Sequence, residues 1–217
     1  LQADPNNVPA QDGVTRIERM RGIADEDTEG QTLNEMFAQE MLKPKEEQNW
    51  TAIDAEIDAY ANKMGLKGAA KTLLKVELLM RRGDFDKARE LIKQAYAEDP
   101  KNINVRRAAY KLVATDPGQG PAKAMQLLEG VANNPEFGDS PVLRLDKADL
   151  LIATNNAAGE NQNEEQLKKE LFALTEGIDQ WPVQQQIQLW SGLGGKFFQI
   201  KLRDEAEECL KKVTDLA

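Results

Sequence analysis

Helix breakers recur along most of this chain and divide it into helices that come in pairs, and no other feature limits the fold as strongly. From residue 69 onward, apolar residues keep the spacing of amphipathic helices. Three of the pairs close on a proline, at Pro100, Pro135 and Pro182, because proline cannot continue a helix. No stretch shows the sustained alternation of a half-buried strand. The sequence therefore predicts an all-α fold built from repeated helix pairs.

Four helix pairs are expected, and their predicted helices follow in chain order. The helices cover residues 69–82 and 86–98, 102–114 and 121–133, 141–154 and 164–180, and 184–201 and 204–216. With their turns, the pairs span 69–100, 101–135, 141–182 and 184–217. The connection 155–163 contains Gly159 and four asparagines but no large apolar residue. We therefore expect an exposed, mobile loop there.

The first 68 residues are less regular. One apolar stripe predicts a helix of about four turns that ends at Gly65; its residues are Trp50, Ile53, Ile57, Tyr60 and Met64. A shorter helix over 33–41 closes before Pro44, since the residue before proline is pushed out of helical geometry. A weaker stripe runs over 17–23. We interpret residues 1–68 as an irregular helical segment or a degenerate repeat.

Small residues recur at matching places in the pairs. Ala88, Ala124 and Ala206 each open a second helix. Four residues later each is followed by a large apolar residue, and these are Ile92, Leu128 and Leu210. The first helix of the last pair carries Trp190, Leu193, Gly194 and Phe197. Small side chains let neighbouring helices approach closely while large ones fill the space beside them.

This pattern resembles the tetratricopeptide repeat family, whose motif has Trp, then Leu-Gly, an aromatic residue, Ala and a large apolar residue. The resemblance is good over 69–135 and 187–217, weaker over 141–182 and faint before residue 68. It implies an α-solenoid of antiparallel helix pairs, a tetratricopeptide-like superhelix. Residues 1–7 resemble the close of a preceding repeat, and Ala217 stands one residue before the expected proline. We expect a segment of a longer array whose natural N-terminus lies upstream.

Charge and hydropathy limit the classes of partner. The net charge is −9, and only residues 69–140 are more basic than acidic, with 12 basic and 10 acidic residues. A chain without a basic stripe lacks what holds phosphate backbones, so nucleic acid is not an expected partner. No apolar run approaches the roughly 18 to 20 residues of a membrane span, so direct membrane insertion is not expected. Cys209, the single cysteine, leaves the redox compartment open.

Catalytic and metal chemistry find little support in the residues. The chain has no histidine, which excludes Ser-His and Cys-His couples and histidine metal ligands. The run from Asp25 to Gly30 resembles the start of a calcium-binding loop, but Met36 stands where the bidentate glutamate belongs. We interpret it as a solvated turn and helix start. We expect no catalytic residue, metal site or cofactor, and hence not an enzyme.

Three further features have ordinary structural interpretations. The glycines in 192–195 fall inside a predicted helix, where a phosphate loop does not form, so we expect packing positions. The paired carboxylates Glu164 and Glu165 stand at a predicted helix start and suit a solvated face. Cys209 has carboxylate neighbours, which raise the pKa of a thiol and make it a poor nucleophile.

The resemblance also implies a binding surface. In the tetratricopeptide family, the first helices of successive pairs line a concave groove that holds peptides. Carried over by motif position, the groove residues of this chain are Glu77, Arg81, Asn104, Arg107, Lys111, Asp149, Gln188, Ser191, Phe198 and Gln199. Arg107 and Lys111 share one helix face, and we expect both to face solvent. With Arg81 they could receive carboxylates from an acidic peptide; the alternative is ordinary surface charge.

The favoured function is a protein–protein interaction scaffold or adaptor that binds a peptide or protein in this groove. An acidic peptide is one candidate partner. The alternative function is a structural spacer or assembly segment of a larger multidomain protein. A binding groove should differ chemically from the rest of the surface, whereas a spacer has no such requirement.

Overall fold

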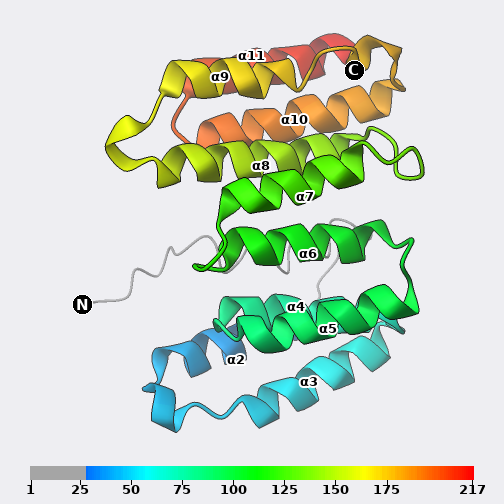
Figure 1. Cartoon of the computed structure of the whole chain (residues 1–217), viewed down its shortest axis with the longest axis vertical. Coiled ribbons are helices and arrows are strands. Elements are labelled where there is room, and N and C mark those ends of the chain that lie inside the picture. Colours follow the sequence, from blue (N-terminus) through cyan, green and yellow to red (C-terminus); the bar gives the residue numbers. More distant parts are fainter. Residues whose placement is uncertain (1–27) are drawn as a thin grey trace. The chain divides into compact units, whose positions relative to one another are not determined.

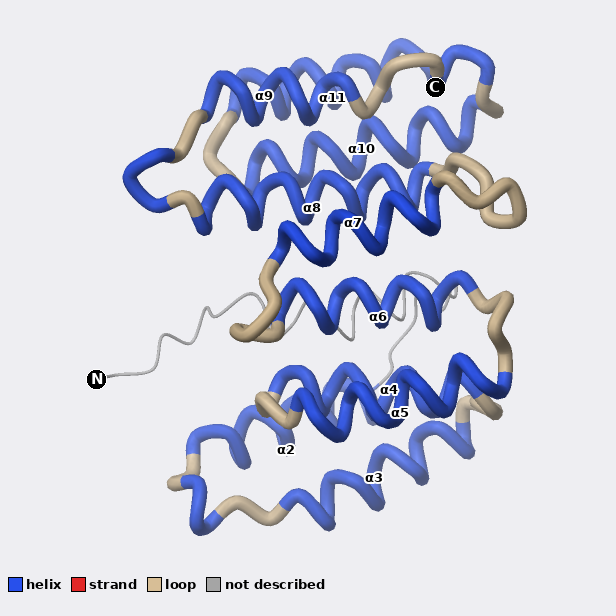
Figure 2. Tube along the Cα trace, viewed as in Figure 1, coloured by secondary structure: helices blue, strands red, loops and turns tan. Residues whose placement is uncertain are grey.

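A computed structural model describes the backbone of residues 28–217 and the side chains from Glu35 onward. Every regular element in this part of the chain is helical (Figures 1 and 2). The α-helices are α2 (Thr28–Leu42), α3 (Trp50–Lys63), α4 (Ala69–Arg81), α5 (Phe85–Glu98), α6 (Ile103–Thr115), α7 (Pro121–Ala132), α8 (Pro141–Ala157), α9 (Glu164–Ala173), α10 (Val183–Gln199) and α11 (Arg203–Leu216). The prediction of an all-α chain is confirmed for these residues. The stripe at 17–23 and the acidic run from Asp25 to Asp27 lie outside them.

The chain divides into two compact units, residues 1–108 and 109–217, and the boundary falls inside α6. Three short 3-10 helices accompany the α-helices, at Lys45–Glu47, Ile178–Gln180 and Gly159–Asn161. Among the described residues, no helix combines the length and the hydropathy of a membrane span. The same residues contain no cluster of three or more metal-ligating side chains.

The core of the first unit lies between α2, α3 and α4. The predicted stripe of α3 is buried at Ile53, Ile57 and Tyr60, which pack with Phe37 of α2. The Phe37 and Trp50 rings lie 5.3 Å apart between centroids. Helices α4 and α5 pack together as a pair. The predicted apolar periodicity therefore fixes this core.

The second unit contains two helix pairs that lie against each other, α8 with α9 and α10 with α11 (Figure 1). Leu145 of α8 approaches Gly192 of α10, and Asp149 of α8 pairs with Lys196 of α10. Both contacts advance by one turn in the same direction, so α8 and α10 run parallel. Lys168 of α9 reaches Glu205 of α11 at 2.8 Å. Equivalent helices of the two pairs therefore lie side by side.

Small residues make the expected close contacts, with one exception. Ala88 and Ala124 are fully buried and Ala206 nearly so, which confirms the prediction. A Cβ added at Gly192 would lie 2.6 Å from the terminal carbons of Leu145, and one at Gly194 would lie 3.3 Å from Cβ of Cys209. The packing interpretation of 192–195 is thus confirmed for these two glycines. It is wrong for Gly195, whose added Cβ would meet no described atom within 4 Å.

Two predicted helix boundaries are wrong, and both lie between α8 and α10. The helix predicted over 164–180 ends at Ala173. A turn over 174–177 follows, and Gly177, left-handed with φ +75°, precedes the separate 3-10 helix at Ile178–Gln180. The loop predicted at 155–163 begins later, since α8 continues to Ala157. The Asn155 side chain accepts a hydrogen bond from the Asn163 backbone at 2.9 Å. Residues 156–163 are exposed, as predicted.

Candidate functional site

The ten residues implied as groove residues all lie on α4, α6, α8 and α10, the first helices of the pairs. The first unit holds Glu77, Arg81, Asn104 and Arg107, and the second holds Lys111, Asp149, Gln188, Ser191, Phe198 and Gln199. The structure brings the last four together on one helix, α10. The basic residues are in a different situation, because each has contacts within its own unit.

Arg81, Arg107 and Lys111 are engaged by neighbouring side chains. Arg81 pairs with Glu77 at 3.0 Å, and its guanidinium lies 5.9 Å from the centroid of the Phe37 ring. Arg107 is only 6% exposed and donates a hydrogen bond to Asn104 at 3.3 Å. The expectation that it faces solvent is therefore wrong. Helical spacing places two residues on one face, but does not tell whether other residues cover that face.

A buried carboxylate, which was not predicted from the sequence, explains the position of Lys111. Asp146 of α8 is 1% exposed. It accepts a hydrogen bond from the Tyr110 hydroxyl, and Lys111 Nζ lies 3.2 Å from its Oδ1. A charge this deeply buried requires a partner of opposite sign. Lys111 is partly exposed, but its ammonium group pairs with a carboxylate inside the unit. No sequence signal separates Asp146 from the exposed carboxylates around it.

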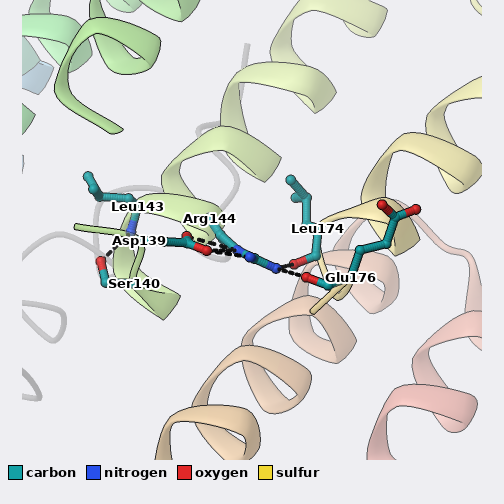
Figure 3. Close-up of polar contacts among 6 residues, drawn as sticks. All are labelled: Asp139, Ser140, Leu143, Arg144, Leu174 and Glu176. Atoms are coloured by element: carbon teal, nitrogen blue, oxygen red, sulfur yellow. Dashed lines mark hydrogen bonds and ion pairs between the residues drawn. The ribbon is translucent and has the colours of Figure 1, made fainter. Parts of the chain in front are cut away.

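Arg144, at the start of α8, holds together three segments of the second unit (Figure 3). Its Nε donates to Asp139 at 2.9 Å, and its Nη1 donates to the backbone oxygens of Leu174 at 2.6 Å and Glu176 at 2.8 Å. The guanidinium also lies 4.5 Å from the centroid of the Trp181 ring. These carbonyls follow the last residue of α9, where helices leave acceptors unsatisfied and favour positive charge. Arg144 therefore has a structural role.

Cys209, Lys168 and the carboxylates near them also lie in structural environments. Burial, followed by the charges of Glu208 and Glu205, raises the pKa of Cys209 to about 12. The thiol is thus a poor nucleophile, as the sequence predicted. Glu205 raises the pKa of Lys168 most strongly, followed by Glu164. Glu164 and its neighbour Glu165 are exposed and begin α9, as expected of a solvated helix start.

The exposed side of α10 differs from every surface described so far. Exposed residues recur on each turn along it, and we call five of them, which follow helical spacing, the α10 stripe: Gln184, Gln188, Ser191, Gly195 and Phe198. The Phe198 side chain is 67% exposed, and Gln199 beside it is exposed as well. Residues 180–195 form the longest uncharged run of the chain, sixteen residues in a sequence that is 30% charged. The α10 stripe is therefore neutral, with an aromatic ring at one end.

The edge of the α10 stripe carries an internal ion pair. Lys196, the first charge after the run, is paired with Asp149 of α8. Both charges therefore serve the packing of α8 against α10. A polypeptide that lies along the α10 stripe meets polar uncharged groups, an open glycine and an exposed phenylalanine.

Comparison with known proteins adds no identification. No protein-family model matches the chain, no curated protein matches it, and no solved structure matches it. The function is therefore inferred from the residues and contacts of the chain itself.

Proposed function

We propose that this chain is a non-enzymatic interaction scaffold, and that it binds a polypeptide along the α10 stripe. The observation that carries the proposal is the neutral, exposed side of α10 with Phe198 at its end. The resemblance to tetratricopeptide repeats supports it, since Gln188, Ser191 and Phe198 stand at groove positions of that motif. We also propose that the two stacked pairs of the second unit are part of a solenoid.

Physical chemistry favours an interface on such a surface. The buried centres of protein interfaces are depleted in charge and enriched in aromatic residues. An exposed phenylalanine stays in contact with water unless a partner covers it, and its full burial is worth about 1.5 to 3 kcal/mol. A neutral surface also spares a partner the desolvation of charges. Along α10, charge is missing where exposure is greatest.

An acidic peptide is a weaker candidate than the sequence suggested. Its expected contacts were Arg81, Arg107 and Lys111, but Arg81 pairs with Glu77 and Lys111 pairs with Asp146. A peptide carboxylate would have to compete with partners already in place. Charge reversal at the buried Arg107 would also disturb folding, so it is a poor test of binding.

The test is substitution of Phe198 by Glu, with Leu127→Glu as the matched control. Leu127 is an exposed apolar residue on α7 of the same unit, at 43% exposure. Both proteins should fold, because both side chains are exposed. Proteins that co-purify with the wild-type chain from a lysate of its source should be lost with Phe198→Glu and kept with Leu127→Glu. Equal recovery from both variants would remove the α10 stripe from the account.

A specific observation keeps the assembly alternative open. Leu171 of α9 is fully buried against the next pair, whereas Leu210, at the same place in α11, is 54% exposed. A face that is covered on one pair and open on the next suits a segment that assembles with another polypeptide. Under this alternative, the chain contributes a stacking surface.

A further inference from the structure

The two helix pairs of the second unit provide an internal comparison between a covered face and an open one. Leu171 and Leu210 are each the eighth residue after the N-cap of their helix, Asn163 for α9 and Leu202 for α11. Leu171 is buried in a cluster that includes Phe197 of α10. No described helix buries Leu210 in this way. The first pair thus shows how this face looks when it is occupied.

The first helices repeat the contrast. Ala148 of α8 and Gly194 of α10 are buried small residues; Ala148 belongs to the cluster that includes Leu171 of α9, and Gly194 lies beside Cys209 of α11. Three residues earlier stand Leu145 and Ser191, and four residues later stand Ile152 and Phe198. Leu145 and Ile152 pack partly buried against the cluster that α10 and α11 help to form. Ser191 and Phe198 are exposed.

We propose that a second copy of this chain covers the open face of α10 and α11 in a two-fold symmetric, antiparallel arrangement. The open face consists of Gln188, Ser191, Gly195 and Phe198 on α10, and Glu207, Leu210, Lys211 and Thr214 on α11. The two sets adjoin, since Leu210 lies beside Gly194. The inference rests on the proposed function, because it names the polypeptide that binds the α10 stripe.

The shape of the α10 stripe suits its own antiparallel copy. Phe198 is large, whereas Ser191 and Gly195 are small. When two α10 helices cross antiparallel near Gly195, Phe198 of each copy lies opposite the small residues of the other. The chain already uses such a contact, because Leu145 of α8 packs against Gly192 of α10. A glycine inside a helix is less stable there than alanine, and close approach of a partner is a physical reason to keep Gly195.

Local charge allows a second copy at this face. Each copy carries a net charge of −9, so two copies repel each other except where their surfaces are neutral. The uncharged run of α10 provides such a surface. On α11, Glu207, Leu210, Lys211 and Thr214 follow helical spacing along one face. Two antiparallel α11 helices place Glu207 of each copy opposite Lys211 of the other, which is the self-complementarity that a two-fold axis requires.

Sedimentation velocity of the purified chain, from about 1 to about 200 µM, tests the inference in the range expected of a small interface. We expect a concentration-dependent dimer. Added salt should strengthen it, because salt screens the repulsion between two acidic copies. Phe198→Glu and Leu210→Glu should each weaken dimerisation at least about tenfold, and Leu127→Glu should not. Circular dichroism checks that every variant remains folded.

Charge exchange tests the symmetry. Glu207→Lys alone and Lys211→Glu alone should each weaken the dimer, because each sets like charges opposite each other. The double variant Glu207→Lys with Lys211→Glu should restore it. A merely structural role of either residue would not give this recovery.

The outcomes separate this inference from the function on which it rests. A monomer at every concentration overturns the second copy, and so does a dimer insensitive to both Phe198→Glu and Leu210→Glu. If the monomeric chain still loses its co-purifying proteins on Phe198→Glu, the proposed function stands with a different polypeptide on the α10 stripe. A dimer that follows the pattern above supports the inference, even when no other protein co-purifies.

Discussion

Helices α8 and α10 have the same length, 17 residues each, and run parallel in neighbouring pairs, yet they differ in how they use polar residues. The charged side chains of α8 are engaged within the unit: Arg144 with Asp139, Asp146 with Lys111, and Asp149 with Lys196. The only charge on α10 is Lys196, which serves α8. The exposed side of α10 has no comparable internal role.

The difference separates residues that build the unit from residues that are available for binding. Substitutions on the polar face of α8 should lower the free energy of unfolding, because they remove the partners of buried groups or of backbone oxygens at a helix end. Substitutions along the α10 stripe should leave the fold intact and change association.

Loss of the buried carboxylate on α8 should have the largest effect. Asp146→Ala removes the anion that faces Lys111 and the acceptor of the Tyr110 hydroxyl, and should lower the free energy of unfolding by about 3 to 5 kcal/mol. Asp149→Ala, one turn further on, should cost about 1 kcal/mol or less, since that side chain is 39% exposed. Urea denaturation measures both. Similar costs would show that burial does not separate the two carboxylates.

Arg144→Lys should come second. Lysine keeps the charge but lacks the planar fork that serves Asp139 and two backbone oxygens at once. We expect a loss of about 2 kcal/mol, in the range of charge-assisted hydrogen bonds. Arg203→Lys, on the exposed start of α11, is the control and should change stability by less than about 0.5 kcal/mol. A silent Arg144→Lys would mean that a point charge suffices at this site.

The glycines of α10 should respond in opposite ways. Gly195→Ala should raise stability by about 0.5 to 1 kcal/mol, because alanine favours the helix and its Cβ meets no described atom within 4 Å. Gly192→Ala should gain less or lose stability, since Leu145 must move away. Thermal unfolding of the two variants side by side measures the difference. A loss of stability in Gly195→Ala would show that this glycine is required by the fold.

The end of α10 should also give a small effect. Lys201 has a left-handed backbone with φ +68°, at a position after a helix where glycine is favoured. Lys201→Gly should therefore stabilise the chain by up to about 1 kcal/mol. Lys212→Gly, inside α11, should destabilise it by about the same amount. If both variants lose stability, the left-handed residue is not strained.

Local pattern predicted the helices and much of the core, because helical period, proline and small residues act over short stretches of sequence. Ala88, Ala124 and Ala206 are buried for this reason. Asp146 is buried beside Tyr110 and Lys111, which are far from it along the chain. Arg144 likewise reaches Leu174, thirty residues away. Helical spacing defines a face but not what covers it. Basic residues predicted to bind a peptide therefore make contacts within the chain instead.

The candidate surface was predicted only in part. Gln188, Ser191 and Phe198 came from the resemblance to the tetratricopeptide motif, and the structure leaves all three exposed. Gly195 was assigned to packing together with Gly192 and Gly194, because three neighbouring glycines cannot be told apart by sequence. Only their surroundings separate them, and those depend on how α8 and α11 lie against α10.

Photo-cross-linking from α10 tests the central claim most directly, that the α10 stripe binds a polypeptide. A photoreactive phenylalanine analogue replaces Phe198 in one protein and Leu127 of α7 in a control protein, and both are irradiated in cells that naturally contain the chain. The account predicts a defined cross-linked polypeptide, either a second copy or another protein, from position 198 and none from position 127. No cross-link from position 198 above the level of the control would contradict it.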